Sequence, residues 1–370
     1  MLGSRISAIG VGVVSIVVLT ACGQSARNAT VVTAEPTSDA VSKLAQYEPI
    51  HSMTFSAATF TAAGGLVIGQ DTVRRVDPTT WSLTPIDALA GVRAVQALDG
   101  GNLVAVGTDA HGDLRLVETS DGGRTVAAKP IPMLGDPAPA AVSQPCFANL
   151  RTGAVLEPNV VSANSSTGIL FTTDDGGATW RHAAAPAFGR LACLAGRLYL
   201  AGGAGEVRLY STTDGGTSWQ PIQITPPAGL ATMRATFDVP TQLSSGELVE
   251  TVTYADVTDA RTAQGAVFTS TDGGANWQPV AAFPFPGVSV NVQVPADYRS
   301  GLWIVADPRG TVLHRSIDSG KHWSDIPVVG LPSANSISFD STNRGLVLAN
   351  GVLYATTDGS SFRNISPPAR

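Results

Sequence analysis

The stretch Thr173-Asp174-Asp175-Gly176-Gly177-Ala178-Thr179-Trp180 decides the fold, because the chain repeats it at regular intervals. The clear copies combine an aspartate with a tryptophan five residues later; they are Asp175 with Trp180, Asp214 with Trp219, Asp272 with Trp277, and Asp318 with Trp323. Degenerate copies surround Asp121 and Asp358. A still more degenerate copy is Asp77-Pro78-Thr79-Thr80-Trp81. The aspartates are 44, 54, 39, 58, 46 and 40 residues apart. A repeat of this period predicts an array of similar structural units.

Each part of the repeated phrase suits a tight turn. The Asp side chain accepts hydrogen bonds from nearby backbone N–H groups, and glycine adopts positive φ at little cost. The Ser or Thr two residues before the Asp adds a local hydrogen bond, and the Trp buries a large apolar surface against the strands. We therefore interpret the phrase as a hairpin turn between the third and fourth strands of a unit. The turns lie at the outer edges of different units, so their aspartates do not converge on a metal or a substrate.

A second pattern keeps the same period, since a Gly-containing turn leads into an apolar run before each Asp phrase. These runs contain Leu66, Leu103, Val155, Leu198, Leu248, Leu302 and Leu346. Four short strands in each repeat predict an all-β, seven-bladed β-propeller of four-stranded antiparallel blades. We place the blade edges near residues 49, 87, 132, 186, 226, 283 and 330. Six or eight blades are the alternatives.

The repeated phrase closely resembles the Asp-box, or bacterial neuraminidase repeat, over about 320 residues of the chain. This resemblance implies a propeller with Asp-box turns. It says less about activity, because such propellers include sialidases, other glycoside hydrolases, sortilin-like receptors and photosystem II assembly factors. The sialidase family also carries a Phe-Arg-Ile-Pro type motif near its start, and this sequence has none.

The N-terminus carries an export signal rather than part of the propeller. Arg5 precedes an apolar stretch from Ile6 to Leu19, which is too short to span a bilayer but suits a signal peptide. Leu19-Thr20-Ala21-Cys22 resembles the bacterial lipobox. The resemblance implies a lipoprotein signal peptide at residues 1–21, and a lipidated Cys22, modified by acyl chains such as palmitate, on a flexible tether over residues 22–48. We expect one propeller domain at residues 49–370, anchored to the cell membrane on its extracytoplasmic side. The alternative is an ordinary secretory signal.

Cys146 and Cys193 are the remaining cysteines. Both precede the Gly-apolar strand of their unit, which places them on the innermost strands of the adjacent third and fourth blades. Export exposes them to an oxidising compartment, so we predict a structural disulfide between them. Two separate buried thiols are the alternative.

Composition and motifs narrow the function. The formal net charge is −6 and no Lys/Arg cluster occurs, so nucleic acid is not an expected partner. The five histidines show no metal-ligand spacing, and the sequence has no phosphate loop, so we expect neither a metal nor a cofactor. A glycosidase needs two carboxylates that converge in a cleft. Asp256, Asp259 and Glu157 are candidates for such a pair, but nothing in the sequence requires the pairing.

The long segments between strands gather on the face opposite the Asp turns, where we place the binding of a partner. The candidate contacts are Tyr254, Asp256, Asp259, Arg261, Phe283 and Phe285. We therefore expect a monomeric, non-catalytic lipoprotein of the cell envelope whose propeller binds or scaffolds a protein or glycan. A sialidase-like glycoside hydrolase acting on extracellular glycans is the alternative function.

Overall fold

The computed structural model describes residues 55–61, 64–69, 72–98, 101–109, 111–132, 144–159, 167–203, 206–243, 245–256, 263–283, 292–293, 303–306, 312–318, 321–327, 334–340 and 343–367. The chain divides into two units, Met1–Glu48 and Pro49–Arg370, and all of the described residues belong to the second. The expected signal peptide, Cys22 and the tether therefore lie outside the described residues.

The described residues form antiparallel sheets that follow one another along the chain. Sheet 1 contains β1 (Phe55–Thr61), β2 (Gly64–Gly69), β3 (Val73–Val76) and β4 (Leu83–Ile86). The short 3-10 helix η1 (Asp87–Leu89) leads to sheet 2, which contains β5 (Val92–Ala97), β6 (Leu103–Thr108), β7 (Leu114–Thr119) and β8 (Ala127–Pro130). Sheet 3 contains β9 (Cys146–Phe147), β10 (Gly153–Pro158), β11 (Gly168–Thr173) and β12 (Arg181–Ala185).

The second half of the chain continues the pattern. Sheet 4 contains β13 (Gly189–Leu194), β14 (Arg197–Gly202), β15 (Arg208–Thr212) and β16 (Gln220–Pro221). Sheet 5 contains β17 (Arg234–Phe237), β18 (Thr241–Gln242), β19 (Leu248–Ala255), β20 (Gln264–Ser270) and β21 (Gln278–Ala282). Sheet 6 contains β22 (Val292–Gln293), β23 (Trp303–Ala306), β24 (Val312–Ser316) and β25 (Ser324–Pro327). Sheet 7 contains β26 (Ala334–Phe339), β27 (Gly345–Ala349), β28 (Val352–Thr356) and β29 (Arg363–Asn364).

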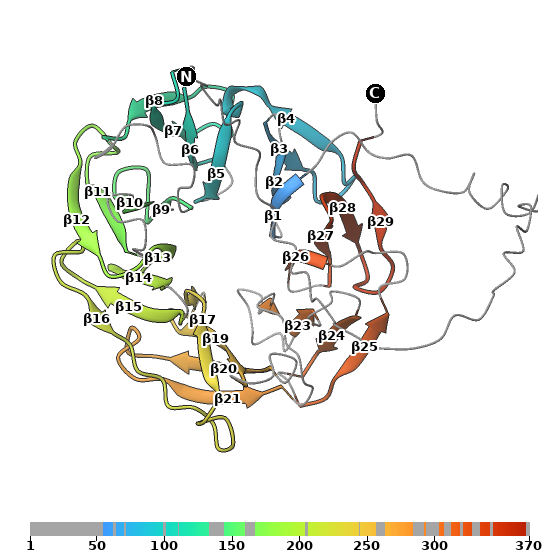
Figure 1. Cartoon of the computed structure of the whole chain (residues 1–370). Helices are drawn as coiled ribbons and strands as arrows, with labels where there is room; N and C mark the ends of the chain where they lie inside the picture. Colours follow the sequence, from blue (N-terminus) through green and yellow to red (C-terminus); the bar gives the residue numbers. More distant parts are fainter. Residues whose placement is uncertain are drawn as a thin grey trace, which may run out of the picture. The chain divides into compact units, whose positions relative to one another are not determined.

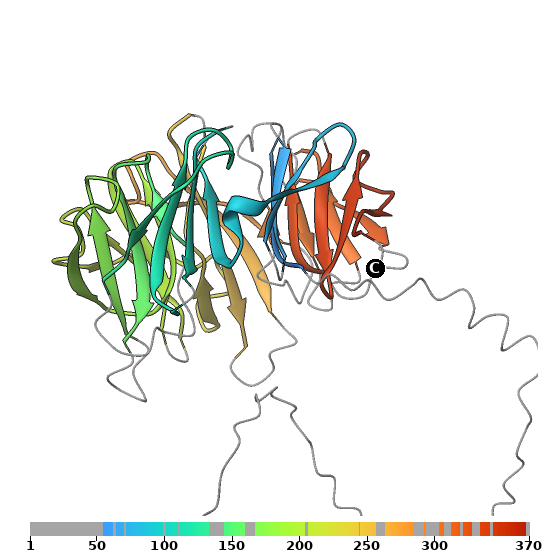
Figure 2. The same ribbon diagram turned by 90° about the horizontal axis from the view of Figure 1, so that it is seen from above.

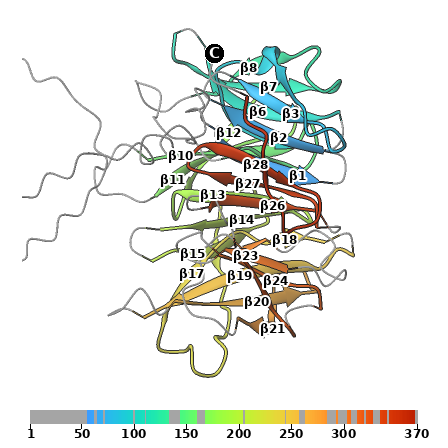
Figure 3. The same ribbon diagram turned by 90° about the vertical axis from the view of Figure 1, so that its right-hand side faces the viewer.

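The sheets stand side by side around a common centre, which makes the unit an all-β propeller of four-stranded antiparallel blades (Figure 1). Seen edge-on, the strands run across the thickness of the ring (Figure 2), and from the side the sheets stack against one another (Figure 3). Apolar clusters lie between neighbouring sheets. One of them joins Val104 and Leu116 of sheet 2 to Val155 and Phe171 of sheet 3. The core is thus built from the faces that two blades turn toward each other.

The ring closes between sheets 7 and 1. Strand β1 contacts β26 and β27, and a shared cluster joins Val67 and Trp81 to Leu346 and Leu353. Every sheet is assembled from consecutive strands, and sheet 7 supplies its own last strand, β29. The two ends of the ring are therefore held together by side-chain packing between blades.

Among the described residues, six sheets have four strands each, whereas sheet 5 has five. Its first strand is split, since both β17 and β18 pair with β19. Phe237 pairs with Val252 and Thr241 with Val249, so β17–β18 contains one residue more than the strand opposite. Pro240 lies in the break, where it has no N–H to donate to the ladder.

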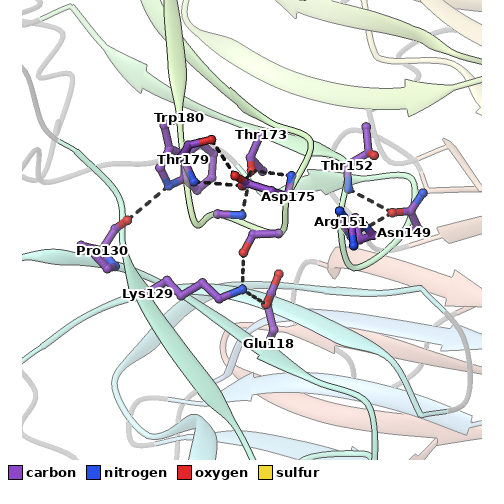
Figure 4. Close-up of polar contacts among 12 residues, drawn as sticks. Glu118, Lys129, Pro130, Asn149, Arg151, Thr152, Thr173, Asp175, Thr179 and Trp180 are labelled. Atoms are coloured by element: carbon purple, nitrogen blue, oxygen red, sulfur yellow. Dashed lines mark hydrogen bonds and ion pairs between the residues drawn. The ribbon is translucent and has the colours of Figure 1, made fainter.

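The repeated Asp phrases form turns with a common hydrogen-bond pattern, which Figure 4 shows for the turn at Asp175. At Asp175, the Thr173 hydroxyl donates to Oδ1 at 2.9 Å, and Thr179 donates its N–H at 2.9 Å and its hydroxyl at 2.6 Å. The Gly177 N–H donates to the Thr173 hydroxyl at 2.7 Å. The Thr179 hydroxyl and N–H, followed by the Thr173 hydroxyl, lower the pKa of Asp175 to about 2. The Asp175 carboxylate is therefore held in hydrogen bonds within its own turn.

The other turns repeat this arrangement. In each, a Ser or Thr hydroxyl donates to the Asp two residues later, at distances between 2.7 and 3.1 Å, at Asp121, Asp214, Asp272, Asp318 and Asp358. The tryptophans pack between blades as well as onto their own strands. The Trp180 Nε1–H donates to Pro130 O of sheet 2 at 3.2 Å, and Trp323 stacks edge-on against Phe283 of sheet 5. The turns are therefore structural joints between neighbouring blades.

The predicted disulfide is confirmed. Cys146 in β9 and Cys193 in β13 are bonded, with their Cα atoms 5.4 Å apart. These are the first strands of sheets 3 and 4, which contact each other. The bridge therefore links two neighbouring blades along their inner edges.

Candidate functional site

A groove lies between sheets 3 and 4, at the ends of the strands that carry the Asp turns. It contains a cavity of about 200 Å³ and an adjoining hollow, and Thr172, Arg181 and Gly215 line both. Leu194, Leu198 and the disulfide residue Cys193 line the cavity, and Ala183 lines the hollow. We refer to this cavity and hollow together as the seam groove.

The interface between sheets 2 and 3 is the comparison for the seam groove, because a charged pair occupies it. Between sheets 2 and 3, the Lys129 ammonium lies 2.8 Å from the Glu118 carboxylate and also donates to Gly176 O in the next Asp turn (Figure 4). The side chains of Lys129 and Glu118 are 32% and 11% exposed, so this pair fills the space between the two sheets.

The same two positions carry short side chains in sheet 3. Lys129 pairs in register with Leu116, and Ala183 pairs with Leu170 at the equivalent place. Glu118 and Thr172 each precede the Thr that begins an Asp turn. Ala183 and Thr172 thus stand where sheet 2 has Lys129 and Glu118, and these shorter side chains line the groove.

Two arginines give the seam groove its polar character. Arg181 contacts Asp174 at 3.0 Å, but the two side chains are 74% and 61% exposed, so water weakens this pair. Arg197 donates to the Ser211 hydroxyl at 3.2 Å and is half-buried. Both guanidinium groups retain donors for a bound molecule, because each has five N–H groups. The nearby Asp214 carboxylate accepts from Ser218 and Thr212 within its own turn.

None of the described residues that were predicted to contact a partner lines the seam groove. Tyr254 and Phe283, two of the candidate contacts, are both fully buried. Tyr254 belongs to β19 and packs between sheets 4 and 5, and the Phe283 ring meets Trp323 at a centroid distance of 5.3 Å. Asp256 is half-buried at the end of β19. The other three, Asp259, Arg261 and Phe285, lie outside the described residues.

Sequence reasoning did not find Thr172, Ala183 or Gly215. The first two are ordinary strand residues, and Gly215 looks like any other turn glycine. A comparison of equivalent positions between repeats could have found them, since Glu118 and Lys129 have no counterpart one blade further on.

A buried carboxyl fills the break in the first strand of sheet 5. Glu250 Oε1 accepts from the Asp238 N–H at 3.0 Å, and Oε2 has no partner among the described residues. Burial, followed by the nearby Asp238 charge, raises the pKa of Glu250 well above its usual range. Arg190 contacts Asp238 at 2.6 Å and partly offsets the effect of that charge.

This carboxyl makes stability depend on pH. The unfolded chain ionises Glu250 near its ordinary pKa of 4.5, whereas the folded chain holds the proton to a higher pH. The contribution of protonated Glu250 to the free energy of unfolding is therefore complete below pH 4.5. This contribution is lost as pH rises toward the higher pKa of the folded chain. We expect Glu250→Gln, which keeps the acceptor for Asp238, to raise the free energy of unfolding at pH 8 by about 2 kcal/mol and to flatten its decline above pH 5. Urea unfolding at several pH values tests this, and an equal decline in both proteins would contradict it.

Glu157 is a second buried carboxyl. It lies in β10 with 3% of its surface exposed, and Oε1 has no partner among the described residues. Burial raises the pKa of Glu157 to about 7. Strand alternation puts it on the same face as Val155, which packs between sheets 2 and 3. Glu157 is therefore placed in a blade interface.

The described part of the chain holds no group of three or more His, Cys, Asp or Glu side chains arranged to bind a metal ion. Within that same part, no helix has the length and apolar character needed to cross a membrane.

Comparison with known proteins supports the fold. The chain matches none of the protein-family models, and a search of curated proteins finds no relative. Among solved structures, it resembles a GH74 xyloglucanase from Xanthomonas campestris, with 18% identity and a TM-score of 0.56 over 84% of this chain and 53% of that one. It also resembles YCF48 bound to D1 peptide, with 17% identity and a TM-score of 0.51 over 83% and 94% of the two chains.

YCF48 from Cyanidioschyzon merolae is similar at 14% identity, with a TM-score of 0.51 over 85% of this chain and 98% of that one. The chain spans about half the length of the xyloglucanase and nearly all of the YCF48 chains. At these identities the comparisons establish a β-propeller, which both catalytic and peptide-binding proteins share.

Proposed function

We propose that this chain is a lipid-anchored, non-catalytic lipoprotein of the cell envelope whose Asp-box propeller binds a segment of a protein partner in the seam groove. In this proposal sheet 5 counts as a blade, so the monomeric ring has seven. The observation that carries the proposal is the opening of one blade interface by Thr172 and Ala183, between two arginines that keep donors for a ligand. YCF48, a similar propeller, has been solved with a bound peptide.

The groove assignment is tested by rebuilding the neighbouring interface. The double variant Thr172→Glu with Ala183→Lys introduces the Glu118–Lys129 pair and should fill the groove. We expect the wild-type chain to co-purify one envelope protein after in-cell cross-linking, and the double variant to lose more than about 90% of it. Gln278→Lys, on the exposed face of β21, is the matched control and should keep the partner. Full retention by the double variant would refute the groove assignment.

The lipid anchor has its own test. The lipobox resemblance predicts that Cys22 carries acyl chains, and anchoring by more than one chain is stable. We expect the wild-type protein to incorporate labelled palmitate and to sediment with membranes. Cys22→Ser should lose the label and appear in the soluble fraction. Labelling that survives this substitution would show that Cys22 is not the lipidated residue.

A glycoside hydrolase is the second candidate, because a GH74 xyloglucanase has a similar fold, and Glu157 is one of the described carboxyls that the sequence offered for this chemistry. Turnover of a panel of fluorogenic glycosides by the chain from residue 30 onward tests it. Activity that disappears in Glu157→Gln would establish this alternative and displace the non-catalytic proposal.

A further inference from the structure

Within the described part of the chain, four blade interfaces share one contact, which involves the carbonyl of the residue directly after the turn Asp. We call this group the turn carbonyl. In each case a side chain of the preceding sheet donates to it: Arg75 to Gly122 O at 3.2 Å, Lys129 to Gly176 O, Tyr199 to Gly273 O at 2.7 Å, and Arg344 to Pro78 O at 3.4 Å. The donors differ in type and in the strand or loop that carries them. All four donate to the same kind of acceptor, the turn carbonyl, and three of the four donor side chains are cationic.

Gly215 holds the corresponding carbonyl of sheet 4. Among the described residues, no side chain of sheet 3 donates to it, and Ala183 stands where sheet 2 has the donor Lys129. The turn carbonyl of Gly359 also receives no side-chain donor from the described residues, but that glycine is buried. Gly215 differs in being exposed and in lining the cavity as well as the hollow.

The surroundings of Gly215 favour a particular kind of ligand. A carbonyl accepts hydrogen bonds and has none to give, so a ligand group that pairs with it must be a donor. The Thr172 hydroxyl and the Asp174 carboxylate, which line the same cavity, add further acceptors. Leu194 and Leu198 supply an apolar wall along which a methylene chain can lie. A carboxylate ligand would leave the Gly215 carbonyl unpaired.

We propose that the seam groove takes a lysine side chain of the protein partner, with its ammonium donating to Gly215 O as Lys129 donates to Gly176 O. The partner thus completes the blade interface that the chain itself leaves open. The stem lies over Ala183, and the ammonium stands between the turn carbonyl and the acceptors of Thr172 and Asp174. At the exposed rim Arg181 lies 3.0 Å from Asp174, whose carboxylate partly offsets the positive charge there. This inference rests on the proposed binding of a protein segment.

The test uses residues 22–370 with Cys22→Ser, labelled with ¹⁵N, and the peptide acetyl-Gly-Lys-Gly-amide as the probe. We expect saturable shifts of the Gly215 and Thr172 amide resonances. Replacing the lysine by Nε-acetyl-lysine should weaken binding at least about tenfold, because a charged hydrogen bond is lost. The peptide with Glu in that place should produce no shifts at Gly215. Thr172→Glu with Ala183→Lys should abolish binding, whereas Gln278→Lys should leave it unchanged.

Several results would overturn the inference: no shifts at Gly215 up to millimolar peptide, equal binding of the acetylated peptide, or stronger binding of the Glu peptide. The titration needs no partner protein, so it separates this inference from the proposed function. A partner that is lost from the groove-filled variant, while the lysine peptide fails to bind, would refute the lysine assignment alone. Binding of the lysine peptide with no partner recovered from cells would refute the proposed function alone.

Discussion

Replacing Cys146 and Cys193 together by alanine is expected to lower the free energy of unfolding by about 4 kcal/mol. The bond closes a loop with a sequence separation of 47, and the chain-entropy cost of freeing such a loop in the unfolded state has this size. A typical domain is stable by about 5–15 kcal/mol, so the loss is a large fraction of the total. The bridge also joins sheets 3 and 4 beside the seam groove, where Cys193 lines the cavity.

Urea unfolding followed by tryptophan fluorescence measures this change, in a Cys22→Ser background so that no third thiol interferes. Reduction of the wild-type protein should reproduce the effect of the double substitution. Reductant should have no effect on the alanine variant, which serves as the control. If neither the double substitution nor reduction changes the midpoint of urea unfolding, the bond contributes nothing to the stability of the ring.

Tyr254→Ala is expected to cost about 3–5 kcal/mol, the usual penalty for deleting a large buried ring. The side chain is fully buried in a cluster with Tyr199, Leu248, Val252 and Phe268. Its hydroxyl has no partner among the described residues. Burial, followed by the Glu250 charge, raises the pKa of Tyr254 to about 12, so the ring stays neutral over the ordinary pH range.

Tyr254→Phe separates packing from the hydroxyl. We expect its stability to be unchanged or raised by about 1 kcal/mol, because an unpaired buried hydroxyl is removed. Binding of the partner by Tyr254→Phe should equal that of the wild type. A stable Tyr254→Ala protein that loses its partner would instead restore this residue to the binding surface. Thermal unfolding together with partner recovery distinguishes the two outcomes.

The repeat could be recognised in the sequence because its hydrogen bonds join residues that are close together along the chain. Asp175 and Thr173 lie two residues apart, so the hydrogen bond between their side chains follows from the phrase itself. The pairing of Cys146 with Cys193 also followed, since both occupy the same place in consecutive repeats. These features depend on neighbouring residues or on the period of the array.

The errors concern contacts between blades and breaks within strands. Tyr254 was predicted to lie on a segment between strands, yet β19 extends to Ala255 and buries it. Phe283 was placed on the surface because its packing partner, Trp323, belongs to another repeat. The split of the first strand in sheet 5 depends on Glu250, a carboxyl whose burial no local pattern indicates.

The seam groove was missed for a related reason. Thr172 and Ala183 are short where sheet 2 has Glu118 and Lys129, and such a difference is visible only when equivalent positions are compared. The sequence prediction placed the partner on the face opposite the Asp turns, whereas the seam groove lies at the turn ends of the strands. The two placements differ enough for one experiment to choose between them.

That experiment is site-specific photo-cross-linking in cells, with the photoreactive residue placed at Thr213 or at Glu206. Thr213 is exposed and lines the seam groove, whereas Glu206 is exposed in the connection between β14 and β15, at the opposite ends of the strands. The proposed function predicts that Thr213 captures one envelope protein, that Glu206 does not, and that the groove-filled variant abolishes the capture. Capture of the same protein from Glu206 and not from Thr213 would contradict it.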